Sequence, residues 1–305
     1  MSIASVSRMG ESAAWEDPDS LSDFLANQLL RGTLTIVLGA GASFGFGLPS
    51  WTKLVQNLAG AVGQKLPENL REEFAAEELL TSNFRGDRMK FAEAIRVELF
   101  KNFDRSLEAL QRNRLLAAVG ALTMASSRGS VSQVVNFNFD DVLELYLTYY
   151  GHDVVSIDMA PEWRVRADVR IHHPHGILPS DLAKPIRRPI VFTQRDYDEV
   201  VGNTKDSWRN VLLDALSSHT CIFIGLSGKD TNLTSIMHDV QKTHVATRSQ
   251  QCFWGVRFAV EGEELERLWM TRGVFVRTMK TYDELPGILF DVCQRAARTR
   301  RSHIA

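Results

Sequence analysis

The chain has 305 residues, of which 44% are hydrophobic and 24% charged, so it can bury a sizeable core and is not globally disordered. Its formal net charge of -2 at pH 7 gives no overall attraction to an anionic membrane, and there is no direct nucleic-acid signal. The three cysteines, Cys221, Cys252 and Cys293, are too far apart to form a CxxC pair, which excludes a zinc ribbon. The N-terminus lacks the apolar core of a signal peptide and no stretch could span a bilayer, so we expect a cytoplasmic protein.

The predicted elements begin behind a polar N-terminus, and we expect residues 1–19 to form a mobile tail. Apolar residues at helical spacing then predict a helix over Leu21–Arg31. Ser20 and Asp23 are placed to form a capping box at its start, and Gly32 is placed to end it.

The remaining elements alternate between strand and helix. Leu34–Leu38 is an apolar run that ends in glycines, which is typical of a strand buried on both faces of a parallel sheet. Residues 51–126 show only helical periodicity and are predicted to be a helical insertion. Further strand-like runs lie at Val131–Phe137, Val154–Ile157, Val169–His172, Ile190–Thr193, Cys221–Gly225, Cys252–Val256 and Val274–Val276. Helical patterns such as Asp141–Tyr150 and Trp208–Ser217 separate several of them, which predicts one Rossmann-like α/β domain over residues 20–305, with a mostly parallel sheet flanked by helices.

The first motif that could carry chemistry is the glycine-rich turn Gly39–Ser43, directly after the first strand. Glycines there let backbone N–H groups approach a phosphate, and a helix start behind them would add a favourable dipole. The dinucleotide fingerprint wants a third glycine where this chain has Phe44. The alternative is a tight turn with no ligand, in which Ser50 simply caps the next helix.

Two further motifs follow predicted strands, where ligands of open α/β sheets gather. In Asn136–Asp141, Asn138 is the candidate functional residue, although Asn and Asp also cap helices and one of Asn138, Asp140 and Asp141 is expected to do only that. In His172–Gly176, adjacent side chains point to opposite faces, so no metal site is expected. His175 suits a general base, whereas His172 and His173 are expected to be structural.

The last motif is the run Ile222–Asp230, in which a buried strand leads into glycine and serine. Gly225 lets the chain pass close to a nucleotide, and Ser227 could bind a phosphate or a ribose. The alternative is an ordinary strand-to-helix turn with Asp230 as the helix cap.

The order of these motifs resembles the sirtuin family, in particular the zinc-less sirtuin-like domains of bacterial antiphage-defence NAD hydrolases. The blocks stand at Gly39–Ser43, Pro49-Ser50-Trp51 with Leu54, Asn138–Glu144, His175-Gly176, Thr193 with Asp196-Tyr197, and Gly225-Leu226-Ser227 with Asp230. The resemblance spans about residues 33–235. Deacetylating sirtuins differ: they carry a four-cysteine zinc module, have Asp-Phe-Arg where this chain has Ser50-Trp51-Thr52, and have Gln where it has Phe137.

The resemblance implies a role for each matching residue. Gly39, Ala40, Gly41 and Ser43 would bind the phosphates of NAD, Gly225 and Ser227 would contact the nucleotide, and Asn138, Asp140 and His175 would be catalytic. Asn138 would orient a water or the ribose, His175 would take a proton, and Asp140 would fix Asn138 or contact the nicotinamide amide.

The expected function is therefore hydrolysis of NAD to nicotinamide and ADP-ribose without a metal, as the effector of an antiphage defence. The resemblance also implies a homo-oligomer and a possible regulatory partner such as a HerA-type ATPase. The alternatives are a non-catalytic sensor of NAD or ADP-ribose, an NAD-dependent protein deacylase, and an ADP-ribosyltransferase.

Overall fold

The computed structural model describes residues 12–67, 70–124, 130–158, 166–202, 207–246, 252–262 and 266–301. Within them, seven strands form one sheet in the order β3-β4-β2-β1-β5-β6-β7, and every neighbouring pair is parallel. The strands are β1 Leu34–Leu38, β2 Gln133–Asn136, β3 Val154–Ile157, β4 Val169–His172, β5 Thr220–Ile224, β6 Gly255–Val260 and β7 Val274–Met279. The predicted Rossmann-like α/β fold is confirmed.

β1 lies at the centre of the sheet and is buried along its whole length. On one side the chain continues to β2, β4 and β3, and on the other β5 is followed by β6 and β7. The direction of winding therefore reverses between β1 and β5. In open parallel sheets such a reversal leaves a crevice beyond the carboxyl ends of the two strands, where ligands bind.

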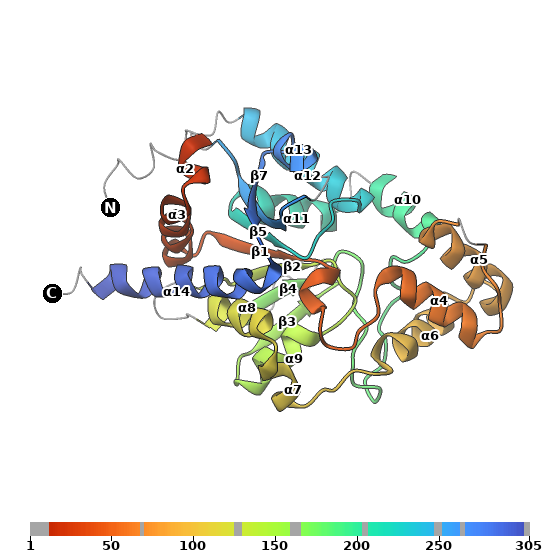
Figure 1. Ribbon diagram of the computed structural model, residues 1–305. Coiled ribbons are helices and arrows are strands. Elements are labelled where there is room, and N and C mark those ends of the chain that lie inside the picture. The colour runs from red at the N-terminus through yellow and green to blue at the C-terminus, as the bar shows by residue number, and fades with distance from the viewer. Residues whose placement is uncertain are drawn as a thin grey trace.

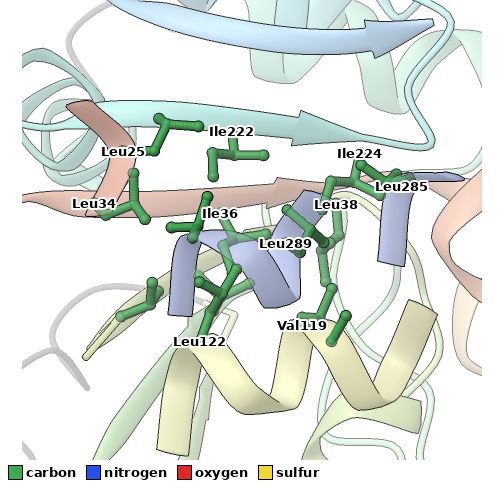
Figure 2. Close-up of a cluster of buried hydrophobic side chains, with 14 of the residues drawn as sticks. Leu25, Leu34, Ile36, Leu38, Val119, Leu122, Ile222, Ile224, Leu285 and Leu289 are labelled. Carbon is green, nitrogen blue, oxygen red and sulfur yellow. The ribbon is translucent and has the colours of Figure 1, made fainter. Parts of the chain in front are cut away.

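Helices cover both faces of the sheet. One face carries α3 (Pro18–Arg31), α8 (Arg114–Met124) and α14 (Leu285–Arg301), which pack against each other and against the sheet. Figure 2 shows Leu25 of α3, Val119 and Leu122 of α8, and Leu285 and Leu289 of α14 around the β1 and β5 side chains Leu34, Ile36, Leu38, Ile222 and Ile224. Side chains alternate along a strand, so Val37 and Phe223 face the opposite core, beneath α11 (Ser207–Ser217) and α12 (Thr231–Ala246).

The described part of residues 51–124 consists of helices and the short connections between them, and contains no strand. It comprises α4 Trp51–Ala61, α5 Glu72–Phe84, α6 Arg88–Phe100, α7 Leu107–Arg112 and α8. The helices α4, α5 and α6, here called the helical lobe, share a third apolar cluster, and Figure 1 shows them gathered at one end of the molecule. α8 instead belongs to the layer on the sheet, so the helices of the predicted insertion serve two cores.

The expected mobile tail differs from the structure over residues 12–19. A short helix, α2 (Ser12–Glu16), precedes α3, and Trp15 is completely buried, with its ring against Phe24, Phe253 and Phe275. Residues 1–11 of the expected tail lie outside the described residues.

α3 therefore begins earlier than predicted. Asp17 caps it by accepting a hydrogen bond from the backbone N–H of Ser20 at 2.9 Å, with Pro18 in the first turn. Gly32 ends the helix as expected, with a φ of 68°.

The strand expected at Ile190–Thr193 is absent. Ile190 and Phe192 are buried in the apolar cluster of the helical lobe, so the run is hydrophobic without pairing to a strand. Thr193 precedes α10 (Gln194–Gly202) and forms a capping box with Asp196: the Thr193 N–H donates to the carboxylate at 2.9 Å and its hydroxyl accepts from the Asp196 N–H at 3.3 Å.

Two smaller points complete the fold. β6 begins at Gly255, three residues later than the predicted start at Cys252, and the preceding Phe253 and Trp254 are buried in two different cores. No helix among the described residues combines the length and the apolar character needed to cross a membrane.

Candidate active site

The sequence motifs meet at one edge of the sheet. The turn Gly39–Ser43 follows β1, residues 138–141 follow β2, residues 173–176 follow β4, and residues 225–230 follow β5. These four strands are consecutive in the sheet and parallel, so their carboxyl ends lie side by side. The candidate residues thus gather at the reversal between β1 and β5 and on the β2–β4 side of it.

The turns after β1 and β5 are in direct backbone contact. The N–H of Gly39 donates to the Ile224 carbonyl at 2.9 Å, and that of Gly41 donates to the Gly225 carbonyl at 3.0 Å. A Cβ at Gly41 would lie 2.7 Å from the Gly225 Cα, and one at Gly225, whose φ is +71°, would lie 2.2 Å from the backbone nitrogen of Ala42. Both glycines are therefore required for this close approach, whatever their role toward a phosphate.

The turn after β1 is not the start of a long helix. A single 3₁₀ turn covers Ala40–Ser43, and α4 begins only at Trp51, where Ser50 caps it through the Lys53 N–H at 3.3 Å. The expected helix dipole behind the glycines is thus confined to one turn. The N–H of Gly41 is already used by the protein, so phosphate binding here would need other donors or a separation of the two turns.

Ser43 connects Asn138 to Asp140. The Asn138 amide nitrogen donates to the Gly39 carbonyl at 2.9 Å and to the Ser43 hydroxyl oxygen at 3.1 Å. The Ser43 hydroxyl in turn donates to the Asp140 carboxylate at 2.8 Å. All three side chains are buried, so this network fixes the Asn138 amide between β1 and β2.

Asp140 is a buried carboxylate with a perturbed pKa. Burial raises its pKa to about 6, the Ser43 hydrogen bond opposes the rise, and nearby Glu144 adds to it. Its other oxygen accepts from the Val142 N–H at 3.3 Å at the start of α9 (Val142–Tyr149), so Asp140 also serves as a partial helix cap. Asp141 does not cap α9 and instead binds the backbone N–H of Ser180 at 3.0 Å.

His173 is structural, as predicted. It is completely buried, with one ring nitrogen 2.5 Å from Glu144 and the other 3.2 Å from the Asn138 carbonyl oxygen. Burial lowers the pKa of His173, but the Glu144 carboxylate outweighs this and the net pKa is raised. Sequence reasoning gave Glu144 no role. The one feature of the sequence that could have pointed to Glu144 is its position within the Asn138–Glu144 block.

His175 lies in an aromatic enclosure. Its ring centroid is 5.1 Å from that of Phe137, 5.2 Å from that of Tyr197 on α10 and 6.3 Å from that of Phe139. Burial lowers the pKa of His175, and the Asp230 carboxylate, 3.4 Å from the imidazole Nε2, partly offsets this. The imidazole is therefore neutral near pH 7 and can accept a proton.

The turn after β5 supplies a helix cap and also places a carboxylate beside His175. Ser227 is exposed, and its hydroxyl oxygen accepts from the Lys229 N–H at 3.3 Å. Asp230 caps α12 through the Leu233 N–H at 2.7 Å, as the structural alternative predicted, yet the same carboxylate faces His175. Among the described residues, no group of His, Cys, Asp and Glu side chains is arranged to hold a metal.

Comparison with models of protein families matches residues 132–276 to the family described as SIR2-like domain. The match supports a sirtuin-like domain. It runs from β2 to the first half of β7 and includes Asn138, Asp140, His175, Gly225 and Ser227, but not the turn after β1. No match was found among the curated proteins.

Sirtuin-like domains generally belong to NAD-dependent enzymes, so the match supports an NAD-related activity. It leaves open which reaction this chain performs. The catalytic and nucleotide-binding roles given to individual residues of the sirtuin-like domain stay predictions.

Proposed function

We propose that this sirtuin-like protein hydrolyses NAD to nicotinamide and ADP-ribose. The observation that carries the proposal is the position of Asn138 and His175. An amide fixed by hydrogen bonds and a buried, neutral imidazole lie beyond the ends of adjacent strands, β2 and β4, beside the reversal of the sheet. A sensor that only binds NAD has no use for this pairing of groups.

The reaction breaks the bond between the ribose C1′ and the nicotinamide nitrogen. The electron pair of that bond goes to the ring nitrogen, so nicotinamide leaves as a neutral molecule and needs no acid. Positive charge then develops on the ribose, as in other glycoside cleavage. The carboxylates of Asp140 and Asp230 border the site and would stabilise this charge.

Asn138 would orient the nucleophile. Its amide nitrogen already donates to the Gly39 carbonyl and to Ser43, so the amide oxygen is the group that would accept a hydrogen bond from a water or a ribose hydroxyl. The water oxygen bonds to C1′, and its proton passes to His175. The products are nicotinamide and ADP-ribose.

We further propose that this reaction depletes NAD during antiphage defence, under the control of self-assembly or of a partner such as a HerA-type ATPase. The support is the resemblance of the ordered motif blocks to those of defence proteins. An NAD-consuming activity that was always on would be toxic to its own cell, so some such control is needed.

The test is to measure NAD consumption and to separate the products for the wild type, Asn138→Ala and His175→Ala. We expect the wild type to form nicotinamide and ADP-ribose in equal amounts, and each variant to lose at least about 100-fold in rate, the lower end of what orientation and general-base groups contribute. The assay is run with purified protein, with a candidate partner, and in cells challenged with phage.

Matched controls are Asn27→Ala on α3 and His152→Ala after α9, both at half-buried positions away from the site, which should keep full activity. If NAD survives with the wild type under every condition, the proposal is wrong. If the label of radioactive NAD stays on a macromolecule, the activity is a transferase and not a hydrolase.

A further inference from the structure

The carboxylate of Asp230 joins three elements beside His175. One oxygen accepts the Leu233 N–H at 2.7 Å and so caps α12. The other lies 3.4 Å from the imidazole Nε2 of His175, an ion-pair distance without a hydrogen bond, and the His175 ring packs edge-on against Tyr197 of α10. α10 contacts both α5 of the helical lobe and α12, so Asp230 sits where the lobe, the sheet and the histidine meet.

The surroundings of His175 make Asp230 important for its charge. The imidazole is 3% exposed and is enclosed by three aromatic rings. A neutral imidazole is tolerated there, but an imidazolium without a counter-charge is expensive in a buried site. Asp230 is the carboxylate that faces it, and its side chain is 20% exposed.

The other ionisable groups near His175 affect the charge of its imidazole less directly than Asp230 does. Tyr197 packs edge-on against the His175 ring, and burial followed by the Asp230 charge holds the pKa of this phenol well above its usual value. The negative charges of Glu73 on α5 and of Asp196 on α10 also raise the pKa of Tyr197.

We propose that Asp230 is the positioning residue for His175: its carboxylate, fixed by the cap on α12, holds the imidazole by its charge and makes it able to accept and hold a proton. This rests on the proposed function in that the proton comes from the water attacking NAD. The carboxylate neutralises the imidazolium formed when His175 takes that proton, and the imidazole returns to its uncharged form when the proton leaves to solvent.

The plain alternative is that Asp230 does no more than cap α12. Asn and Ser are N-caps of similar quality to Asp, so Asp230→Asn and Asp230→Ser keep the cap and remove the charge. Asp230→Glu keeps the charge on a longer side chain. The matched control is Asp87→Asn, at another helix cap that accepts the Lys90 N–H at 3.1 Å in the helical lobe.

The first measurement is NMR titration of the histidine rings in the full chain, without NAD, with His175 assigned by comparison with His175→Gln. In Asp230→Asn and Asp230→Ser the half-protonation pH of His175 should fall by about one unit or more, as expected when an opposite charge within about 4–6 Å is removed. It should stay unchanged in Asp87→Asn and be partly restored in Asp230→Glu.

The second measurement is the pH profile of NAD cleavage. The acid limb should move to lower pH in Asp230→Asn, with kcat reduced by about 10–100-fold and KM changed much less, the pattern of a lost transition-state interaction. A capping role alone would leave both the limb and the titration of His175 where they are, and that result overturns the proposal.

The two proposals fail separately. If the wild type does not cleave NAD but His175 titrates lower in Asp230→Asn, the proposed function is wrong and the coupling of the pair stands. If the wild type cleaves NAD and the titration of His175 is unmoved in both Asp230→Asn and Asp230→Ser, the hydrolase stands and Asp230 is only a cap.

Discussion

Asp140 carries a charge that the folded protein holds at a cost. Burial raises the pKa of Asp140 to about 6, from an ordinary value of 3.8. Between these two values the folded state binds more protons than the unfolded state, so the free energy of unfolding falls as pH rises through this window and stays lower above it. A shift of about two units corresponds to at most about 3 kcal/mol.

Asp140→Asn is therefore expected to stabilise the protein at pH 8 by up to about 3 kcal/mol and to have almost no effect below pH 4, because the carboxyl of the wild type is then neutral. The Ser43 hydroxyl can still donate to the amide oxygen. Urea unfolding at pH 4, 6 and 8 measures this. Asp283→Asn, at an exposed site, is the control and should change nothing. A variant that is less stable than the wild type at pH 8 would show that the charge is favourable.

At the residue scale the sequence predicted where the candidate side chains would lie better than what they would contact. Asn138, Asp140 and His175 could be placed because each follows a strand-like run and stands in an ordered block. The bridge from Asn138 through Ser43 joins residues 95 positions apart, and the His173–Glu144 pair joins residues on different elements. Such contacts depend on how strands align, which no local pattern contains.

At the element scale, the candidate site depends on the close approach of the turns after β1 and β5. Gly225→Ala would place a methyl group against the backbone of Ala42 and also force a positive φ on a residue with a side chain. We expect a loss of more than about 2 kcal/mol in unfolding free energy, and lower NAD affinity where the wild type binds NAD.

Gly151→Ala is the matched control for this prediction. Its φ of +80° is similar, but nothing lies within 4 Å of the added Cβ, so only the backbone strain of about 1 kcal/mol applies. Denaturant melts of both variants compare the two costs directly. Equal losses would mean that contact between the turns contributes nothing, and that the glycines are kept for another reason.

The strands show where pattern reading succeeds and where it fails. β1, β3 and β4 have the predicted bounds. β1 is apolar and buried along its length and ends at a glycine, as a buried parallel strand should, whereas β3 and β4 are partly buried and include Ser156 and Arg170. Ile190–Thr193 has the same appearance but lies in a buried loop, since its apolar side chains fill the core of the helical lobe. The capping pair Thr193 and Asp196 marks a helix start that would have bounded the run.

At the scale of the whole molecule, the composition and the alternation of elements were enough to predict a Rossmann-like α/β fold. Composition and alternation could not predict whether the N-terminal segment packs against the sheet. The N-terminal segment is polar on average. Average polarity does not show whether one large aromatic ring within the segment is buried. Trp15 is fully buried and joins α2 to the core beneath α3, α14 and β7.

Trp15→Ala should therefore destabilise the whole domain by about 3–5 kcal/mol, the usual cost of truncating a buried aromatic residue. The ring packs against Phe24 of α3 and against Phe275 of β7, so its loss leaves a cavity between elements from opposite ends of the chain. Val245→Ala, at a site that is 67% exposed, is the control and should cost less than about 0.5 kcal/mol. Chemical unfolding followed by far-UV circular dichroism compares the two, and a Trp15→Ala variant as stable as the wild type would restore the view of this segment as a tail.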